Sequence, residues 1–150
     1  MRVLAVIPAR GGSDRVPYLN IRRLGDAPLL AHTLRAAREA KGIDRVIVST
    51  DDETVADVAR AHGAEVPFLR PSELSRDLSS LMPVVRHAVG EAEKTGERAD
   101  VVLVLQATTP FRTARSIEEA LDRIATGRFT AVVSVTSDLS LRWKAEDGRL

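Results

Sequence analysis

An arginine followed by two glycines stands close to the start of the chain, in the segment Arg10-Gly11-Gly12-Ser13. Adjacent glycines let backbone N–H groups turn toward a bound anion, because no Cβ hinders the approach. The Arg10 side chain adds a permanent positive charge and a planar fork of donors that suits a phosphate group. These residue types, in this order, predict a turn that binds an anion.

The loop that contains this turn is long for a connection between two elements. An apolar run over residues 3–7 indicates a buried strand, and the next helix signal comes only at Ala27-Pro28. The loop over residues 8–26 therefore exceeds the roughly 2–6 residues of an ordinary strand-to-helix connection, and loops of this length are usually functional. We expect it to bind an oligophosphate.

Three further segments place polar residues where strands are expected to end. They cover residues 49–52, 69–74 and 106–112. In an open parallel sheet the ligand binds beyond the carboxyl ends of the strands, so these segments should meet the first loop there. The arginines that they and the first loop bring to this edge are Arg10, Arg15, Arg70 and Arg112. We predict a convergent anion site with hydrogen-bonding specificity.

Asp51 follows the second expected strand, and two interpretations of it stay open. Its carboxylate could bind a ribose hydroxyl, as an acidic residue does in dinucleotide-binding folds, or it could cap the next helix. Thr50 and Glu53 also fit a capping box at this helix start.

Composition and missing motifs exclude several classes of function. The chain has no GxxxxGKS/T and no GxGxxG sequence, which disfavours P-loop NTPases and dinucleotide-binding domains. Cysteine is absent, so thiolate chemistry and disulfides are excluded, and the three histidines lack the spacing of metal ligands. A net charge of +1 does not indicate a nucleic-acid footprint. No apolar run approaches about 18 residues, so we expect no membrane segment and a cytoplasmic protein.

The elements that must position these residues alternate between strands and helices. Alternating strands and helices are typical of βαβ units with a parallel sheet, so the predicted fold class is α/β. Residues 101–105 are expected to form a central strand buried on both faces, and residues 65–68, which include Pro67, a strand near a sheet edge. The five expected strands cover residues 3–7, 45–49, 65–68, 101–105 and 130–135.

Helix starts and stops are also readable. Pro28 suits a first helical position, Ser79 or Ser80 could cap a third helix, and Thr113 should begin a fourth that Gly127 ends. We expect residues 1–150 to form one nucleotide-binding domain. The alternation over residues 141–146, followed by Asp147-Gly148, predicts that residues 137–150 start a hairpin that the chain does not complete.

Four blocks of sequence resemble one known family. They are IPARGGSDRVPYLNI at residues 7–21, VSTDD at 48–52, VPFLRPSEL at 66–74 and LQATTPFRT at 105–113. Together, in this order, they resemble the acylneuraminate (CMP-sialic acid) cytidylyltransferases. The resemblance implies a Rossmann-like nucleotidyltransferase domain, a three-layer αβα structure with a mostly parallel twisted sheet. It also implies transfer of CMP from CTP to a sialic-type (nonulosonic) sugar acid, with Mg²⁺ and with release of pyrophosphate.

The resemblance assigns expected roles to individual residues. Arg10, Arg70 and Asn20 are expected to carry catalysis, and Gln106, Thr109 and Arg112 to bind the acceptor sugar acid. The residues expected to bind CTP are Arg10, Gly11, Gly12, Ser13, Arg15, Asn20, Arg70 and Ser80. The family's metal-binding aspartates are expected beyond residue 150, as is most of a dimerisation segment, so a homodimer is expected of a full-length protein.

Two departures from the family pattern leave alternatives open. Asp14 and Leu19 stand where the family has lysines that are expected to contact phosphates, and Arg15 could compensate. The chain could therefore be an active cytidylyltransferase or a nucleotide-binding domain of the same fold with impaired catalysis. It could also transfer CMP to another acceptor, such as a phosphonate or another keto acid.

Overall fold

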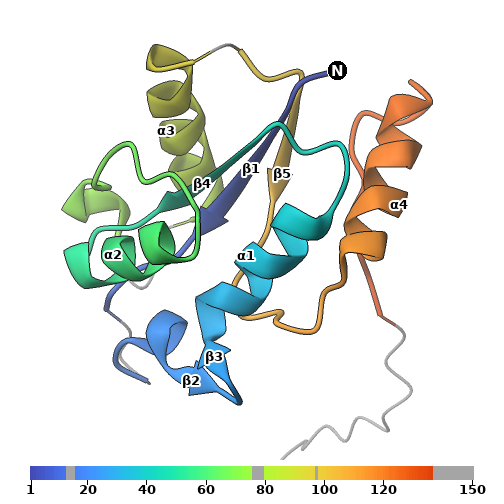
Figure 1. The fold of residues 1–150 in the computed structure, drawn as a ribbon. Helices are drawn as coiled ribbons and strands as arrows, with labels where there is room; N and C mark the ends of the chain where they lie inside the picture. The colour runs from blue at the N-terminus through green and yellow to red at the C-terminus, as the bar shows by residue number, and fades with distance from the viewer. Residues whose placement is uncertain (13–15, 76–79, 97, 137–150) are drawn as a thin grey trace, which may run out of the picture.

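The computed structural model describes residues 1–12, 16–75, 80–96 and 98–136. Within them, β1 (Val3–Pro8) is the middle strand of a three-stranded parallel sheet, between β4 (Arg45–Ser49) and β5 (Val101–Val104) (Figure 1). Ile7 lies opposite Val48 of β4, and Val6 lies opposite Val104 of β5. Ser13, Asp14, Arg15, Ser79 and the tail over residues 137–150 lie outside the described residues.

Side chains of β1 point alternately to two hydrophobic clusters, one on each face of the sheet. Val3, Ala5 and Ile7 pack with α1 (Leu29–Glu39), α2 (Glu53–Ala61) and α4 (Ala114–Ala125). Leu4 and Val6 pack, together with Ile47, against α3 (Leu81–Lys94). The expected three-layer αβα fold with a parallel sheet is confirmed (Figure 1).

Several local predictions are also confirmed. The second strand covers residues 45–49 as expected. The Thr113 hydroxyl caps α4 by accepting a hydrogen bond from Ser116 N at 3.2 Å, and Gly127 follows the helix with φ of 69°. Pro28 is the N-cap of α1 rather than its first helical residue.

The prediction that residues 101–105 form the central strand is wrong. In the described part of the chain β5 is an edge of the sheet, and Val102 is 38% exposed. An apolar run shows that a strand is buried, but its neighbours decide whether it lies in the middle. The most continuous buried run, that of β1, takes the central place.

The predicted fifth strand over residues 130–135 is also wrong. Among the described residues none pairs with this segment, and Val135 is 90% exposed. A β-strand requires a neighbour for its backbone N–H and C=O groups, so β-branched residues alone do not produce one.

The predicted strand over residues 65–68 is reduced to two isolated parallel bridges, Ile47 with Glu65 and Thr50 with Leu69. Both lie along the outer side of β4, so the expected edge position is confirmed. Pro67 stands between the bridges and has no N–H to donate, which explains the interrupted ladder.

The helix caps differ in part from the prediction. The Asp52 carboxylate, and not a box of Thr50 and Glu53, caps α2 by accepting from Val55 N at 3.0 Å. Ser80 stands at the N-cap of α3, but its side chain makes no capping hydrogen bond.

The long first loop contains structure of its own. It holds a 3₁₀ turn, η1 (Leu19–Ile21), and a short antiparallel ribbon of β2 (Arg23–Leu24) and β3 (Ala27–Pro28). A second 3₁₀ turn, η2 (Ser72–Leu74), follows Arg70. None of the helices in the described ranges is both long enough and apolar enough to cross a membrane.

Candidate functional site

The loops that follow β1 and β4 are joined at the carboxyl ends of these strands. Ala9 N donates to Ser49 O at 2.9 Å, which extends the pairing of the two strands by one residue. Beyond that point Gly11 N donates to the Asp51 carboxylate at 3.1 Å. The glycine turn therefore lies at the edge of the sheet where a ligand of an α/β fold binds.

The two glycines of the turn have different surroundings. Gly11 is buried, and a Cβ on it would lie 2.4 Å from Cβ of Asp52, so no other residue fits there without movement. Gly12 is exposed, and a Cβ on it would meet nothing within 4 Å. Neither has a positive φ, so Gly11 is required by space and not by backbone conformation.

Asn20 fixes the far end of the same loop. It is buried, and its side-chain Nδ2 donates to the backbone oxygen of Arg10 at 2.9 Å. The 3₁₀ turn η1 places it there, ten residues further along the chain. The backbone that carries Arg10 is thus held from two sides, by Asn20 and by the bond between Gly11 and Asp51.

Arg70 lies in the segment between α2 and η2, beside the end of β4, and its side chain is only 4% exposed. Its backbone N donates to Thr50 O at 2.7 Å, Nε donates to the Ser75 hydroxyl at 3.1 Å, and Nη2 lies 3.5 Å from the Asp51 carboxylate. The structure thus brings Arg70 and the glycine turn to one carboxylate, although they are about sixty residues apart in sequence.

The charges at this edge influence one another. Burial lowers the pKa of the Arg70 guanidinium, the Asp51 carboxylate opposes that shift, and the positive charge of Arg10 adds to it. Because an arginine ionises far above neutral pH, Arg70 keeps its charge. The guanidinium groups of Arg10 and Arg70 therefore lie near the carboxylates of Asp51 and Asp52 at the end of the sheet, and they offer charged donors that suit an anion.

The residues expected to bind the acceptor form a separate group after β5. Arg112 Nη1 lies 3.5 Å from the backbone oxygen of Gln106, and Thr109 N donates to the same oxygen at 3.2 Å. Gln106 and Thr109 are exposed, whereas Arg112 is partly buried, and this burial lowers the pKa of its guanidinium. This turn lies on the other side of β1 from Arg70, because β5 and β4 flank β1.

The other predicted residues are placed only in part. Ser80 is exposed at the start of α3. Ser13 and Arg15 lie outside the described residues.

Sequence reasoning missed the two residues that link this site together. Of the two interpretations of Asp51, the helix cap is wrong, because Asp52 is the cap; Asp51 instead joins Gly11 to Arg70, a role that the sequence does not predict. No sequence pattern singles out Ser75, whose hydroxyl accepts from Arg70 Nε at 3.1 Å. Two consecutive acidic residues after a strand offered a signal, because only one of them is needed at an N-cap.

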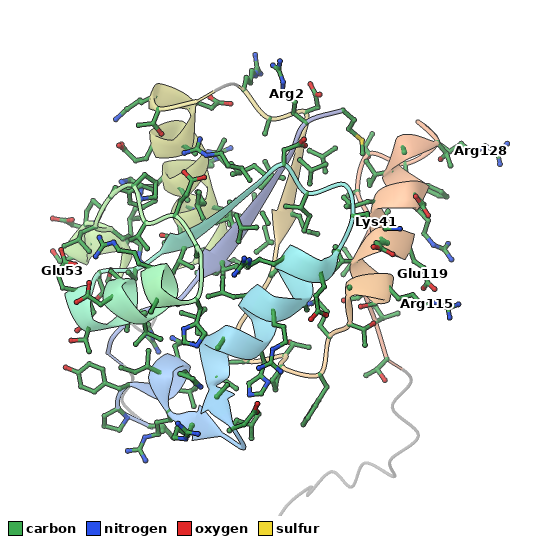
Figure 2. All side chains as sticks on the ribbon, in the orientation of Figure 1. Arg2, Lys41, Glu53, Arg115, Glu119 and Arg128 are labelled. Atoms are coloured by element: carbon green, nitrogen blue, oxygen red, sulfur yellow. The ribbon has the colours of Figure 1, made fainter. Side chains whose placement is uncertain are left out.

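Two cavities lie at the opposite end of the sheet. One of about 200 Å³ is lined by Arg2, Asp44 and Arg45 among others, and one of about 350 Å³ by Lys41 and Glu118 among others. Figure 2 shows Arg2 and Lys41 near this end, away from the first loop. Asp44 accepts from Val3 N at 2.7 Å, and Arg45 pairs with Glu65 at 2.7 Å. Both charged side chains therefore already have partners within the fold.

A metal site is not formed by the described residues alone. Among them no three His, Cys, Asp or Glu side chains lie together in a way that could hold a metal ion. Asp51 and Asp52, the acidic residues nearest the glycine turn in the described part of the chain, already contact Arg70, Gly11 N and Val55 N at the start of α2. The described residues alone therefore do not provide a complete Mg²⁺ site.

Comparison with known proteins adds to this geometry. A family model described as cytidylyltransferase matches residues 4–146. The chain belongs to this cytidylyltransferase family. The resemblance to acylneuraminate cytidylyltransferases, predicted from the four blocks of sequence, is confirmed by this match and by named relatives.

Two curated relatives show how far the similarity extends. The chain is 43% identical over 143 residues to CMP-N,N'-diacetyllegionaminic acid synthase of Legionella pneumophila, covering 95% of this chain and 60% of that protein. It is 37% identical over 142 residues to N-acylneuraminate cytidylyltransferase of Oncorhynchus mykiss, covering 95% of this chain and 32% of that protein. The chain thus spans between about a third and three fifths of these relatives.

A solved structure of similar fold is that of CMP:2-keto-3-deoxy-manno-octonic acid synthetase complexed with CTP. It matches with a TM-score of 0.71 at 25% identity, covering 84% of this chain and 48% of that one. This similarity supports the assignment of the three layers to a nucleotidyltransferase fold.

Proposed function

We propose that this chain is the nucleotide-binding part of a cytidylyltransferase that transfers CMP from CTP to a sialic-type (nonulosonic) sugar acid. The observation that carries the proposal is the joined arrangement of the Gly11 turn, Asp51 and Arg70 at the carboxyl ends of β1 and β4. Family membership and the named relatives support the nucleotide and the class of acceptor.

In the proposed reaction a hydroxyl oxygen of the sugar acid forms a bond to the α-phosphorus of CTP and loses its proton to water. The bond from that phosphorus to the β-phosphate bridging oxygen breaks, and pyrophosphate leaves. Arg10 and Arg70 would neutralise charge that grows on the phosphate oxygens, and the exposed Gly12 amide would donate to one of them. Because this chemistry depends mainly on positioning, the rigid support of the loop by Asn20 matters as much as the charges.

We propose binding roles for the other predicted residues as well. Ser13, Arg15 and Ser80 would add contacts to CTP. Gln106, Thr109 and Arg112 would bind the acceptor, with the Arg112 guanidinium facing its carboxylate. Mg²⁺ would neutralise charge on the triphosphate.

The function is tested with the full-length protein that contains this chain. We expect pyrophosphate release from CTP, Mg²⁺ and at least one nonulosonic acid, with phosphonates and other keto acids assayed in parallel as acceptors. Arg70→Lys should lower kcat/KM by at least about tenfold, because lysine keeps the charge but loses the fork of donors. Arg115→Lys is the matched control, since Arg115 is exposed on α4 beside Glu119 (Figure 2). No pyrophosphate release with any acceptor would refute the activity.

A second candidate function is CTP binding without turnover. Asp14 and Leu19, which stand where the resemblance expects lysines, favour it. Calorimetry that finds tight CTP binding in a protein without turnover would support this candidate. Turnover gained by the double variant Asp14→Lys, Leu19→Lys would identify these two positions as the cause.

The compartment, oligomeric state and binding partners are also proposed. We infer a cytoplasmic enzyme, a homodimer at full length, that acts on CTP and a sugar acid without binding nucleic acid or membranes. The net charge of +1 supports the absence of a nucleic-acid footprint.

A further inference from the structure

One carboxylate oxygen joins two parts of the candidate site that come from different loops. Asp51 Oδ1 accepts from Gly11 N at 3.1 Å and lies 3.5 Å from Arg70 Nη2. The Asp51 side chain is 25% exposed, whereas that of Arg70 is 4% exposed. The contact therefore lies at the base of the site, where water screens it less than at the surface.

The neighbours of Asp51 are engaged in other contacts. Thr50 O accepts from Arg70 N, and Thr50 Oγ1 accepts from Asp52 N at 3.2 Å. Asp52 Oδ1 accepts from Val55 N and so begins α2. Asp51 is thus held between a strand end and a helix start. The Asp52 side chain packs against Gly11, whereas the Asp51 carboxylate accepts the hydrogen bond from Gly11 N.

The charges of Arg10, Arg70 and Asp51 act on one another. The positive charge of Arg10 acts on Arg70, so the two guanidinium groups are near enough to repel each other. Asp51 is the carboxylate paired with Arg70, and it offsets part of this repulsion. Without that charge, the repulsion between Arg70 and Arg10 would lose this offset, and the Arg70 side chain would keep its hydrogen bond to the Ser75 hydroxyl.

We propose that Asp51 is a positioning residue, which fixes the Gly11 turn and the Arg70 guanidinium relative to each other before CTP binds. It acts through these two groups and does not contact the nucleotide. This inference rests on the proposed function, because CTP is the ligand for which the two groups are aligned.

CTP affinity of the full-length protein tests this role. Asp51→Asn keeps the size of the side chain and removes the charge, and we expect the Kd for CTP to rise about tenfold, the effect of losing one hydrogen bond to a charged group. Asp51→Glu, which keeps the charge, should restore part of the affinity. Asp57→Asn is the matched control, because Asp57 also pairs with an arginine, Arg60 at 2.9 Å, but is 75% exposed on α2. Its Kd should not change.

Two further measurements separate positioning from direct contact and from general loss of structure. If Asp51 acts through Arg70, the double variant Asp51→Asn, Arg70→Met should bind CTP no more weakly than Arg70→Met alone. If Asp51 instead binds the ribose, Asp51→Asn would weaken CTP more than 2′-deoxy-CTP, and the inference would be overturned. Equal loss for both nucleotides, with an unchanged unfolding midpoint, supports positioning.

Hydrogen exchange in the ligand-free protein makes the test independent of the proposed function. The Gly11 amide should exchange at least about tenfold faster in Asp51→Ala than in the wild-type protein or in Asp57→Asn, because it loses its acceptor. If the wild-type protein does not bind CTP, the proposed function fails. In that case the exchange rate of the Gly11 amide still shows whether Asp51 orders the loop. Unchanged exchange, or unchanged CTP affinity of Asp51→Asn in a protein that binds CTP, overturns the inference.

Discussion

Gly11 and Gly12 are neighbours in sequence, but they meet different constraints. Gly11 packs against Asp52 so closely that its missing Cβ is a condition of the fold. Gly12 has open space around its α-carbon and leaves its backbone exposed. The first glycine therefore holds the turn in place, and the second is the one that a ligand could approach.

Alanine substitutions should separate these two roles. We expect Gly11→Ala to lower the free energy of unfolding by about 1–3 kcal/mol, because the added methyl group forces Asp52 and the start of α2 to move. Gly12→Ala should change it by less than about 0.5 kcal/mol. Urea denaturation of both variants measures the difference, and equal losses would contradict the packing described for Gly11.

Helices α2, α3 and α4 begin in different ways, and this affects how each is stabilised. The side chains of Asp52 and Thr113 accept backbone hydrogen bonds at the starts of α2 and α4. Ser80 stands at the start of α3 without such a bond. α3 is therefore stabilised by packing, through residues such as Ala88 against Leu4 and Val6, and not by a side-chain cap.

Because of this difference, replacing the N-cap residue by alanine should destabilise the protein more at α4 than at α3. Thr113→Ala should cost about 1 kcal/mol of stability, because Ser116 N loses its acceptor. Ser80→Ala should cost only a few tenths of a kcal/mol, since no capping bond is lost. Thermal unfolding followed by circular dichroism compares the two, and a larger loss for Ser80→Ala would show that the assigned caps are wrong.

At the scale of the whole molecule, β1 connects the two hydrophobic clusters. Its alternate side chains reach α1, α2 and α4 on one face and α3 on the other. Neither layer of helices can separate from the sheet without exposing residues of the same strand. We therefore expect the described fold to unfold as one unit.

Substitutions on opposite faces of the sheet test this expectation. Leu34→Ala and Ile47→Ala should each lower the free energy of unfolding by about 2–5 kcal/mol, because both side chains are fully buried in different clusters. Met82→Ala, at a position 61% exposed, is the control and should have little effect. Circular dichroism and hydrogen exchange should give one common transition for each variant. Separate transitions for the two faces would contradict the single unit.

The sequence by itself determined the features that depend on neighbouring residues. These include the strand over residues 45–49, the start of α4 at Thr113 and the α/β class. It also provided the four blocks that indicated the family, and it predicted that Arg10, Gly11, Asn20 and Arg70 belong to one site. Each of these follows from local hydrophobic pattern, capping chemistry or motif, which are present in a short stretch of chain.

Only the tertiary structure decided which strand lies in the middle, which aspartate caps α2 and which one joins the loops. The bond from Gly11 to Asp51 spans forty residues, and that from Asp51 to Arg70 spans nineteen. The order of strands likewise depends on pairing between distant segments, as the edge position of β5 and the unpaired residues 130–135 demonstrate. Such choices follow from long-range packing and charge, because two adjacent aspartates are chemically identical until the fold gives them different neighbours.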